Sequence, residues 1–392
     1  MENIWSENKY VNITINVLLF LLGMNFMHYA QILVPIICII IFIDKKYKFY
    51  VNNIKIFFIL CLFGVTFLLF SYKTEGIFAL IGLFIPLAYY IGSNIYKPNE
   101  EKLKTIIFIL AFSMTLHIIL NFAVDLAFRG FECFSKNSHY DIWTLNEYPT
   151  TQTAVNYILI LGIIYYLFVY ETNRKIKATG ITLFIIAFIY LIALGRRTPI
   201  FIFGIVVLFT SIVDYSCLKN RNKGTMILLG LLLFSIVFGI LLYLIYKNNL
   251  FNLGETVERL GIVRKFISVA FYTPRLEIVK ETIKLAPQHL LGGREISTIM
   301  DLGPHELWLD VFDISGIVPY IILVIYSISC LIIIIKILSD SNISKTFGIM
   351  IFSLFLSIIL QFFMEPIMSG SSVILLCVIV IISSLECLTL NN

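Results

Sequence analysis

The chain has 392 residues, of which 59% are hydrophobic and only 14% are charged, and its formal net charge is +5. A soluble domain is roughly half apolar and a quarter charged, so the composition excludes a soluble protein built around one aqueous core. The basic residues are dispersed between apolar segments, which is typical of the flanks of membrane spans and argues against nucleic acid as a partner. The sequence has no P-loop and no Cys-x-x-Cys pair, so we predict no cofactor and no metal site.

Apolar runs long enough to cross a bilayer recur along the chain. They predict an all-α polytopic membrane protein, a single domain over residues 1–392, with about twelve transmembrane helices. No cleavable signal peptide is expected, because Glu2 and Glu7 precede the first run and no small-residue cleavage site follows it. The predicted spans are Ile13–Met27, Ala30–Ile43, Ile54–Tyr72, Gly76–Gly92, Thr105–Phe128, Thr151–Tyr170, Ile176–Leu194, Pro199–Val213, Met226–Tyr246, Gly316–Ile335, Thr346–Phe363 and Ser371–Leu388.

The orientation follows from the basic residues of the loops, since cytoplasmic loops are enriched in Lys and Arg. Every even-numbered loop is basic, which predicts cytoplasmic termini and external odd-numbered loops. Examples of these basic residues are Lys45, Lys97, Arg174, Lys219 and Lys336.

The two longest connections, 129–150 and 247–315, are therefore predicted to be external. The second lies between spans nine and ten, and a connection of this length is uncommon unless it is functional or disordered. Thr273 and Pro274 suit an N-cap and a first helical position. They predict a short amphipathic helix on the membrane surface, with an apolar face of Leu276, Val279 and Ile283.

Arg196 and Arg197 form a basic pair between spans seven and eight. One interpretation is a charged helix cap, which is what most arginines near span ends are. The other is a binding site, because paired external arginines oppose the usual charge bias and arginines at membrane depth normally have partners. Guanidinium groups bind phosphate oxygens through two parallel hydrogen bonds, so the predicted ligand is an anion at the membrane surface.

A second constellation runs through the long external loop, with Arg275 in the amphipathic helix and Arg294 after a Gly-Gly turn. Pro304 suits a first helical position and would place His305 in the first turn of a helix. The positive helix terminus there favours a neutral imidazole that accepts a proton. A lone loop histidine can equally be an ordinary polar residue, so both interpretations stand.

Two weaker candidates complete the set. His117, Asn121 and Asp125 are spaced four apart in span five, so they share one helix face, which either lines helix contacts or borders a substrate groove. Glu365, with Pro366, forms a polar turn after span eleven that either only reverses the chain or faces the site.

Several of these features occur in the order typical of one family. That family has a Ser-Arg-small-Ala/Pro motif between two spans, followed by a large external loop. The loop contains an arginine opening an amphipathic helix, a Leu-hydrophobic-Gly-x-Gly turn, and a His-Asn pair before a Gly-hydrophobic-hydrophobic-Gly segment. The corresponding stretches here are Arg197-Thr198-Pro199, Arg275, Leu290-Leu291-Gly292-Gly293, His305-Glu306 and Gly316-Ile317-Val318-Pro319.

Through this ordered set the chain, from about Thr151 to Phe363, resembles the bacterial O-antigen ligases and the related O-antigen and capsule polymerases. It departs from the pattern at Glu306, where the family usually has Asn, and at Pro319, which replaces the second glycine. The resemblance implies a multi-pass protein of the bacterial inner membrane with an external active face. It also implies membrane lipid, chain-length regulators and flippases as partners.

The activity that the resemblance implies is glycan transfer from undecaprenyl diphosphate to a sugar hydroxyl, without nucleotide or metal. Arg197 and Arg275 would bind the diphosphate with Arg196 in support, and His305 would be the general base. Further site candidates are Arg294, Glu306 and Glu365.

We expect a polymerase, whose acceptor is another lipid-linked repeat unit. The alternatives are a ligase, whose acceptor is the lipid A core, and a lipid-linked oligosaccharide transporter. A transporter would favour internal symmetry and several charges near the midplane of the bilayer, which the sequence does not show.

Overall fold

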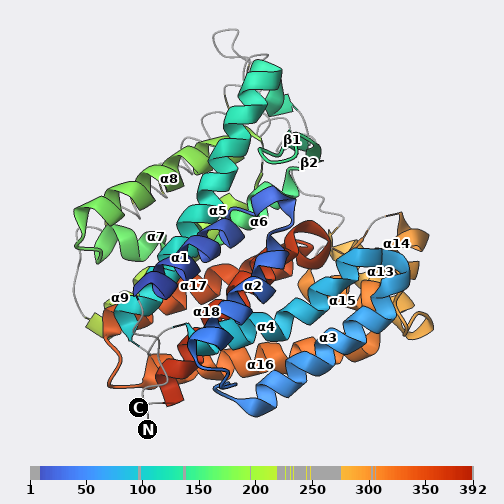
Figure 1. The fold of residues 1–392 in the computed structure, drawn as a ribbon. Helices are drawn as coiled ribbons and strands as arrows, with labels where there is room; N and C mark the ends of the chain where they lie inside the picture. Colours follow the sequence, from blue (N-terminus) through green and yellow to red (C-terminus); the bar gives the residue numbers. More distant parts are fainter. Residues whose placement is uncertain are drawn as a thin grey trace. The chain divides into compact units, whose positions relative to one another are not determined.

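The computed structural model describes residues 9–95, 99–135, 138–194, 196–218, 275–301, 303–304 and 306–390, and the single positions 226, 230, 233, 244 and 248. This part of the chain is helical apart from one antiparallel hairpin, β1 (Ser138–Tyr140) with β2 (Glu147–Pro149) (Figure 1). Eight helical segments within it are long and apolar enough to cross a membrane. The protein is thus an all-α, multi-pass membrane protein, as predicted.

Every predicted span except the ninth overlaps a helix. The ninth, Met226–Tyr246, lies outside the described residues apart from isolated positions. The helices are α1 (Lys9–Gly23), α2 (Leu33–Asp44), α3 (Ile54–Glu75), α4 (Ile81–Asn94), α5 (Glu100–Arg129), α6 (Thr151–Asn156), α7 (Ile158–Val169), α8 (Arg174–Ala193), α9 (Thr198–Leu218), α16 (Ile317–Ser339), α17 (Lys345–Met364) and α18 (Ile367–Leu390).

The lengths of these helices separate complete spans from shorter ones. α1 and α2 have 15 and 12 residues, fewer than the roughly 20 that cross a bilayer. The apolar run Ile54–Asn94 has 41 residues, about twice the length of one crossing. It divides at Gly76, which adopts a φ of +57° and ends α3. α3, with 22 residues, and α4, with 14, are accordingly separate helices, divided between the two spans that the sequence predicted.

The described chain forms two compact units. The first contains residues 1–113, 274–343 and 362–392, and the second contains residues 114–273 and 344–361. The prediction of a single membrane domain stays a prediction.

Small residues allow close helix packing in the first unit. A Cβ atom on Gly64 of α3 would lie 2.4 Å from the carbonyl oxygen of Gly82 in α4, and one on Gly92 would lie 2.3 Å from that of Val380 in α18. Membrane helices associate through such contacts, because lipid provides no hydrophobic drive between apolar surfaces. α4 is therefore packed tightly between α3 and α18.

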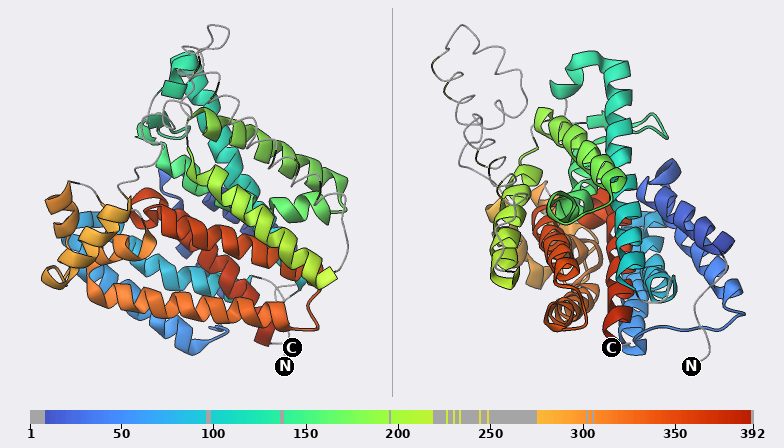
Figure 2. Two further views of the ribbon diagram at one scale, coloured as in Figure 1. Left: turned by 180° about the vertical axis from the view of Figure 1, so that it is seen from behind. Right: turned by 90° about the vertical axis from the view of Figure 1, so that its left-hand side faces the viewer.

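In the second unit, α7 is the central helix, with α8 and α9 packed against it (Figure 2, green). All but the last two residues of α7 are buried. Gly162 brings α7 close to α17, since a Cβ atom there would lie 2.7 Å from Leu354 Cα. Ser357 Oγ donates a 2.9 Å hydrogen bond to the carbonyl oxygen of Ile158, which fixes the same contact.

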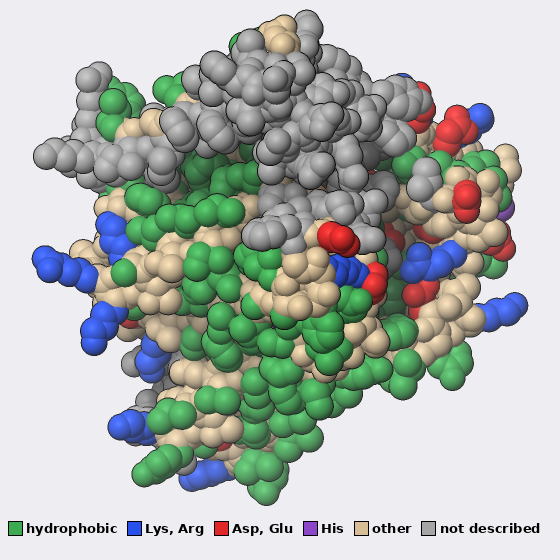
Figure 3. Space-filling model, turned by 90° about the horizontal axis from the view of Figure 1, so that it is seen from above, with side chains coloured by type: hydrophobic (Ala, Val, Ile, Leu, Met, Phe, Trp, Pro, Cys, Tyr) green, Lys and Arg blue, Asp and Glu red, His purple; other side chains and the backbone are tan. Residues whose placement is uncertain are grey.

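Large apolar side chains are exposed along the outer helices. The side chains of Phe58 and Leu69 in α3 and of Ile335 in α16 are each at least 63% exposed. Green apolar side chains cover much of the described surface in Figure 3, whereas Lys and Arg are scattered over it, some of them next to acidic side chains. Such a surface is suited to lipid rather than to water.

Candidate functional site

The segment that the sequence predicted to be external contains α13 (Arg275–Leu285), which begins at Arg275, close to where a helix was predicted. The apolar face that was predicted to lie on the membrane surface is not the stripe that the protein itself buries. Ile278 and Thr282 are buried, whereas Ile283 is 58% exposed. The helix therefore turns a different stripe inward, because its partner is the following helix α14 (Glu295–Met300) and Thr282 contacts Met300 there.

The Gly-Gly turn packs against the entry of α16. The amide of Gly293 donates to the carbonyl oxygen of Ile314 at 3.0 Å, and the amide of Ile317 donates to that of Leu290 at 2.9 Å. Gly316 ends α15 (Leu307–Ser315) with a φ of +83°, and a Cβ atom on it would lie 2.4 Å from Leu290 O. Two glycine motifs that are 24 positions apart in the sequence thus form one backbone contact.

Arg294 follows this turn in the left-handed conformation, with a φ of +58°. Its amide donates to the carbonyl oxygen of Asp313 at 2.8 Å, and its guanidinium forms an ion pair with Glu75 at the end of α3. The predicted substrate candidate Arg294 is therefore bound to a carboxylate of its own chain. Nothing in the local sequence indicates this partner, because Glu75 lies 219 positions away.

The predicted helix start at Pro304 is wrong. α15 begins at Leu307, and Glu306 occupies its N-cap in an extended conformation. His305, which was predicted to lie in the first helical turn, is outside the described residues. Glu306 is half-buried, and burial raises its pKa.

Glu365 lies in the bend between α17 and α18. The predicted polar turn is present, but its carboxylate is only 3% exposed. A buried ionisable group of this kind must be hydrogen-bonded or neutral, so the side chain belongs to the interior of the bend.

The arginine pair of the second unit lies between α8 and α9. The amide of Arg196 donates to the carbonyl oxygen of Leu191 at 2.9 Å, and its Nη1 donates to Thr151 Oγ1 at 3.4 Å. Arg197 is half-buried, and its carbonyl oxygen accepts from the amide of Phe201 at 3.0 Å, in the first turn of α9.

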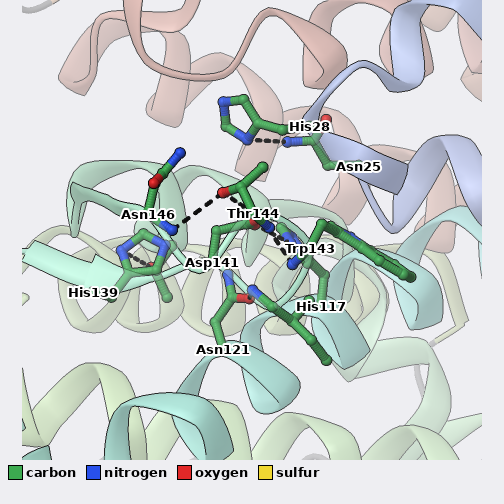
Figure 4. Close-up of polar contacts among 11 residues, drawn as sticks. Asn25, His28, His117, Asn121, His139, Asp141, Trp143, Thr144 and Asn146 are labelled. Carbon is green, nitrogen blue, oxygen red and sulfur yellow. Dashed lines mark hydrogen bonds and ion pairs between the residues drawn. The ribbon is translucent and has the colours of Figure 1, made fainter. Parts of the chain in front are cut away.

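The polar stripe of α5 provides the most complete polar cluster of the second unit (Figure 4). His117 Nε2 lies 2.9 Å from Asp141 Oδ1, and Asn121 Oδ1 accepts from the amide of Ile142 at 2.9 Å. Asp125 Oδ1 accepts from the amide of Tyr140, also at 2.9 Å. The three side chains contact the hairpin loop and strand β1, so of the two predicted roles the structure shows the stripe lining an intrachain contact.

Arg129, four residues beyond Asp125, extends the stripe. Its Nη1 donates to the carbonyl oxygen of Ser138 at 2.9 Å, and its Nη2 pairs with Glu147 at 2.6 Å. The guanidinium carbon lies 4.3 Å from the centroid of the Tyr140 ring. Arg129 continues the four-residue spacing of the stripe, so the spacing in the sequence could have indicated its place in this contact.

The electrostatics of the hairpin keep its acids charged and one histidine neutral. Burial alone would raise the pKa of Asp141, but hydrogen bonds from His117 and the amides of Thr144 and Trp143 outweigh it and lower that pKa. Hydrogen bonds from Ser138 and Arg129 lower the pKa of Glu147 to about 2.

His139, on strand β1, is the neutral histidine. Burial, followed by the nearby charge of His117, lowers its pKa to about 3. At neutral pH the His139 imidazole therefore carries no charge.

The predicted site residues are distributed over both units. Arg275, Arg294, Glu306 and Glu365 belong to the first, and Arg196 and Arg197 to the second. Among the described residues, no group of three or more His, Cys, Asp or Glu side chains could hold a metal ion. No family model matches the chain, and no curated protein shows significant sequence similarity to it.

Proposed function

We propose that the protein is a metal-independent glycosyltransferase that extends surface polysaccharide chains in the bacterial inner membrane, with its active face external. The support is the ordered set of motifs from Arg197 through Arg275, the Gly-Gly turn and His305 to Gly316. The contact between the turn and Gly316 is compatible with this order, because it joins two of the motifs through their backbones.

The donor is a glycan on undecaprenyl diphosphate, and the acceptor is a sugar hydroxyl of another lipid-linked repeat unit. The acceptor oxygen forms a bond to the anomeric carbon while the bond from that carbon to the diphosphate breaks. The hydroxyl proton passes to His305, and undecaprenyl diphosphate leaves with the electron pair. Because diphosphate is a good leaving group, the protein mainly has to orient the reactants and neutralise the developing charge.

Arg197 and Arg275 are assigned to the diphosphate, with Arg196 in support. Guanidinium presents parallel donors that match phosphate oxygens, which a lysine ammonium cannot reproduce. We assign no substrate contact to Arg294 in the resting protein, because it is paired with Glu75.

The charge of the external segment favours a polymerase over a ligase. Lys284 pairs with Glu281 at 3.1 Å, and His289 lies 2.5 Å from Glu295. Among the described residues of this segment, charges of both signs alternate, which does not favour binding of a phosphate-rich lipid A core. A ligase remains the alternative. If the protein is a ligase, loss of the gene should leave long glycans attached to undecaprenyl diphosphate.

The deciding experiment supplies the purified protein in vesicles with lipid-linked repeat units alone. Lengthened glycans would support the polymerase. His305→Ala and Arg275→Ala should abolish lengthening while membrane insertion stays normal, and Arg197→Lys should reduce it by at least about tenfold. Substrate that crosses the bilayer without a new glycosidic bond would identify a transporter instead.

A further inference from the structure

The hairpin 138–149 depends on α5 for its order. An isolated two-stranded hairpin is marginally stable at best in water. Here His117, Asn121, Asp125 and Asp141 are each at most 3% exposed, and the three helix residues make the contacts with the hairpin described above. Asp125 also accepts a hydrogen bond from the Tyr190 hydroxyl at 2.9 Å, which fixes the carboxylate from a second helix. The stripe therefore holds the hairpin in one conformation.

The hairpin is in turn connected to the arginine pair. β2 ends at Pro149, and α6 begins two residues later at Thr151. The hydroxyl of Thr153 lies 3.3 Å from Nδ1 of His139, which joins α6 to strand β1. Thr151, on the same helix, accepts the 3.4 Å hydrogen bond from Arg196 Nη1.

A second observation places Arg196 near the hairpin. Its positive charge is among the causes that lower the pKa of His139, after burial and the charge of His117, while the charge of Asp141 acts in the opposite direction. The contacts thus run without interruption from the α5 stripe, through β1 and α6, to the guanidinium of Arg196.

We propose that His117, Asn121 and Asp125 are positioning residues: by holding the hairpin 138–149 against α5 they orient Arg196. This inference rests on the proposed function, in which Arg196 supports binding of a lipid diphosphate. A guanidinium gives two parallel hydrogen bonds to phosphate only when its plane is held in the right direction. An arginine between two helix ends has many rotamers, so external contacts that select one of them strengthen binding.

Four variants distinguish the orientation of Arg196 by the hairpin from a general loss of stability. His117→Ala removes the contact to Asp141, whereas His117→Gln can retain a nitrogen donor toward it. Thr151→Val removes only the acceptor of Arg196. Ser357→Ala, the matched control, loses a buried 2.9 Å hydrogen bond of the same unit that does not involve the hairpin.

Three measurements are made on the full-length protein in vesicles. The first is the KM for lipid-linked repeat units, compared with kcat. The second is the rate of tryptic cleavage after Arg196 and Arg197, identified by mass spectrometry, which reports the order of this segment whether or not the protein is an enzyme. A nitroxide on Asn146→Cys reports hairpin mobility in each variant.

We expect His117→Ala to increase hairpin mobility and tryptic cleavage and to raise KM about tenfold, with a smaller change in kcat. Thr151→Val should raise cleavage and KM without changing hairpin mobility, and His117→Gln and Ser357→Ala should resemble the wild type. The inference is overturned if His117→Ala loosens the hairpin but leaves cleavage unchanged, or if Thr151→Val alters neither cleavage nor KM. If the wild type lengthens no glycan while the cleavage pattern appears as expected, the proposed function fails and the structural link stands.

Discussion

Two segments that connect helices of this protein are fixed by opposite means. The hairpin 138–149 of the second unit is held by charged and polar side chains of α5 that bind its backbone. The turn at Gly292–Gly293 in the first unit is held by backbone contacts with the entry of α16, where no side chain fits.

The difference determines which changes each segment tolerates. A side-chain contact survives any replacement that keeps the same donor or acceptor, but it responds to pH when the groups titrate. A backbone contact is insensitive to pH, but it fails when a single Cβ atom is added. The predictions below test this contrast.

The largest effect is expected at Gly316. An alanine there would place Cβ 2.4 Å from Leu290 O at a φ of +83°, and we expect a loss of about 3 kcal/mol from overlap and left-handed strain together. Gly293→Ala shares the positive φ but meets nothing within 4 Å, so it should cost only about 1–2 kcal/mol. Gly303→Ala, whose nearest neighbour is 3.5 Å away, is the neutral control. Thermal unfolding in detergent measures the series, and equal melting temperatures for all three would refute the backbone interpretation.

Asp125→Leu should be the most damaging change to the hairpin. It removes the acceptor of the Tyr140 amide and of the Tyr190 hydroxyl, and buried donors left without partners cost about 1–3 kcal/mol each. Asp125→Asn keeps an acceptor oxygen for the amide and should retain most of the order. Nitroxide mobility at position 146 measures both. Equal mobility in the two variants would show that the charge, and not the hydrogen bond, holds the hairpin.

Acid should loosen the hairpin through His139. Its pKa of about 3 when buried is below the roughly 6.5 of a free imidazole, so between these values the opened state binds a proton and the closed state does not. Closure should therefore weaken about tenfold for each pH unit below 6.5. Asp141 and Glu147 have lowered pKa values in the closed hairpin, so both stay charged there. Their contribution to hairpin closure is therefore lost only when the pH falls below about 4.

The same nitroxide at position 146, attached at neutral pH and then titrated, follows this opening. His139→Asn should flatten the profile between pH 6.5 and 4. A profile that persists in this variant would show that His139 does not control the opening. The turn at Gly292–Gly293 should show no comparable change in this range.

The smallest effect is expected for the ion pair between Glu75 and Arg294, whose side chains are 19% and 32% exposed. Solvent screening limits such a pair to about 1 kcal/mol or less. Glu75→Gln should therefore shift the melting temperature only slightly, since the backbone contacts of the turn remain. A destabilisation as large as that of Gly316→Ala would show that the turn also depends on side chains.

The sequence by itself determined the helical membrane architecture, because long apolar runs have no other stable conformation in lipid. It also located most helix boundaries and the division at Gly76, since glycine and charged residues interrupt hydrophobic periodicity locally. The start of α13 near Arg275 could be predicted from the sequence for the same reason.

Only the tertiary structure decided what the polar residues bind. The four-residue spacing of His117, Asn121 and Asp125 showed a shared helix face, but not that this face would bind a hairpin. The stripe that α13 buries could not be predicted because it depends on α14, and the partner of Arg294 was unpredictable because Glu75 is 219 positions distant. Apolar burial is set by local composition and by the surrounding lipid, whereas hydrogen bonds and ion pairs require a specific partner that folding brings from elsewhere in the chain.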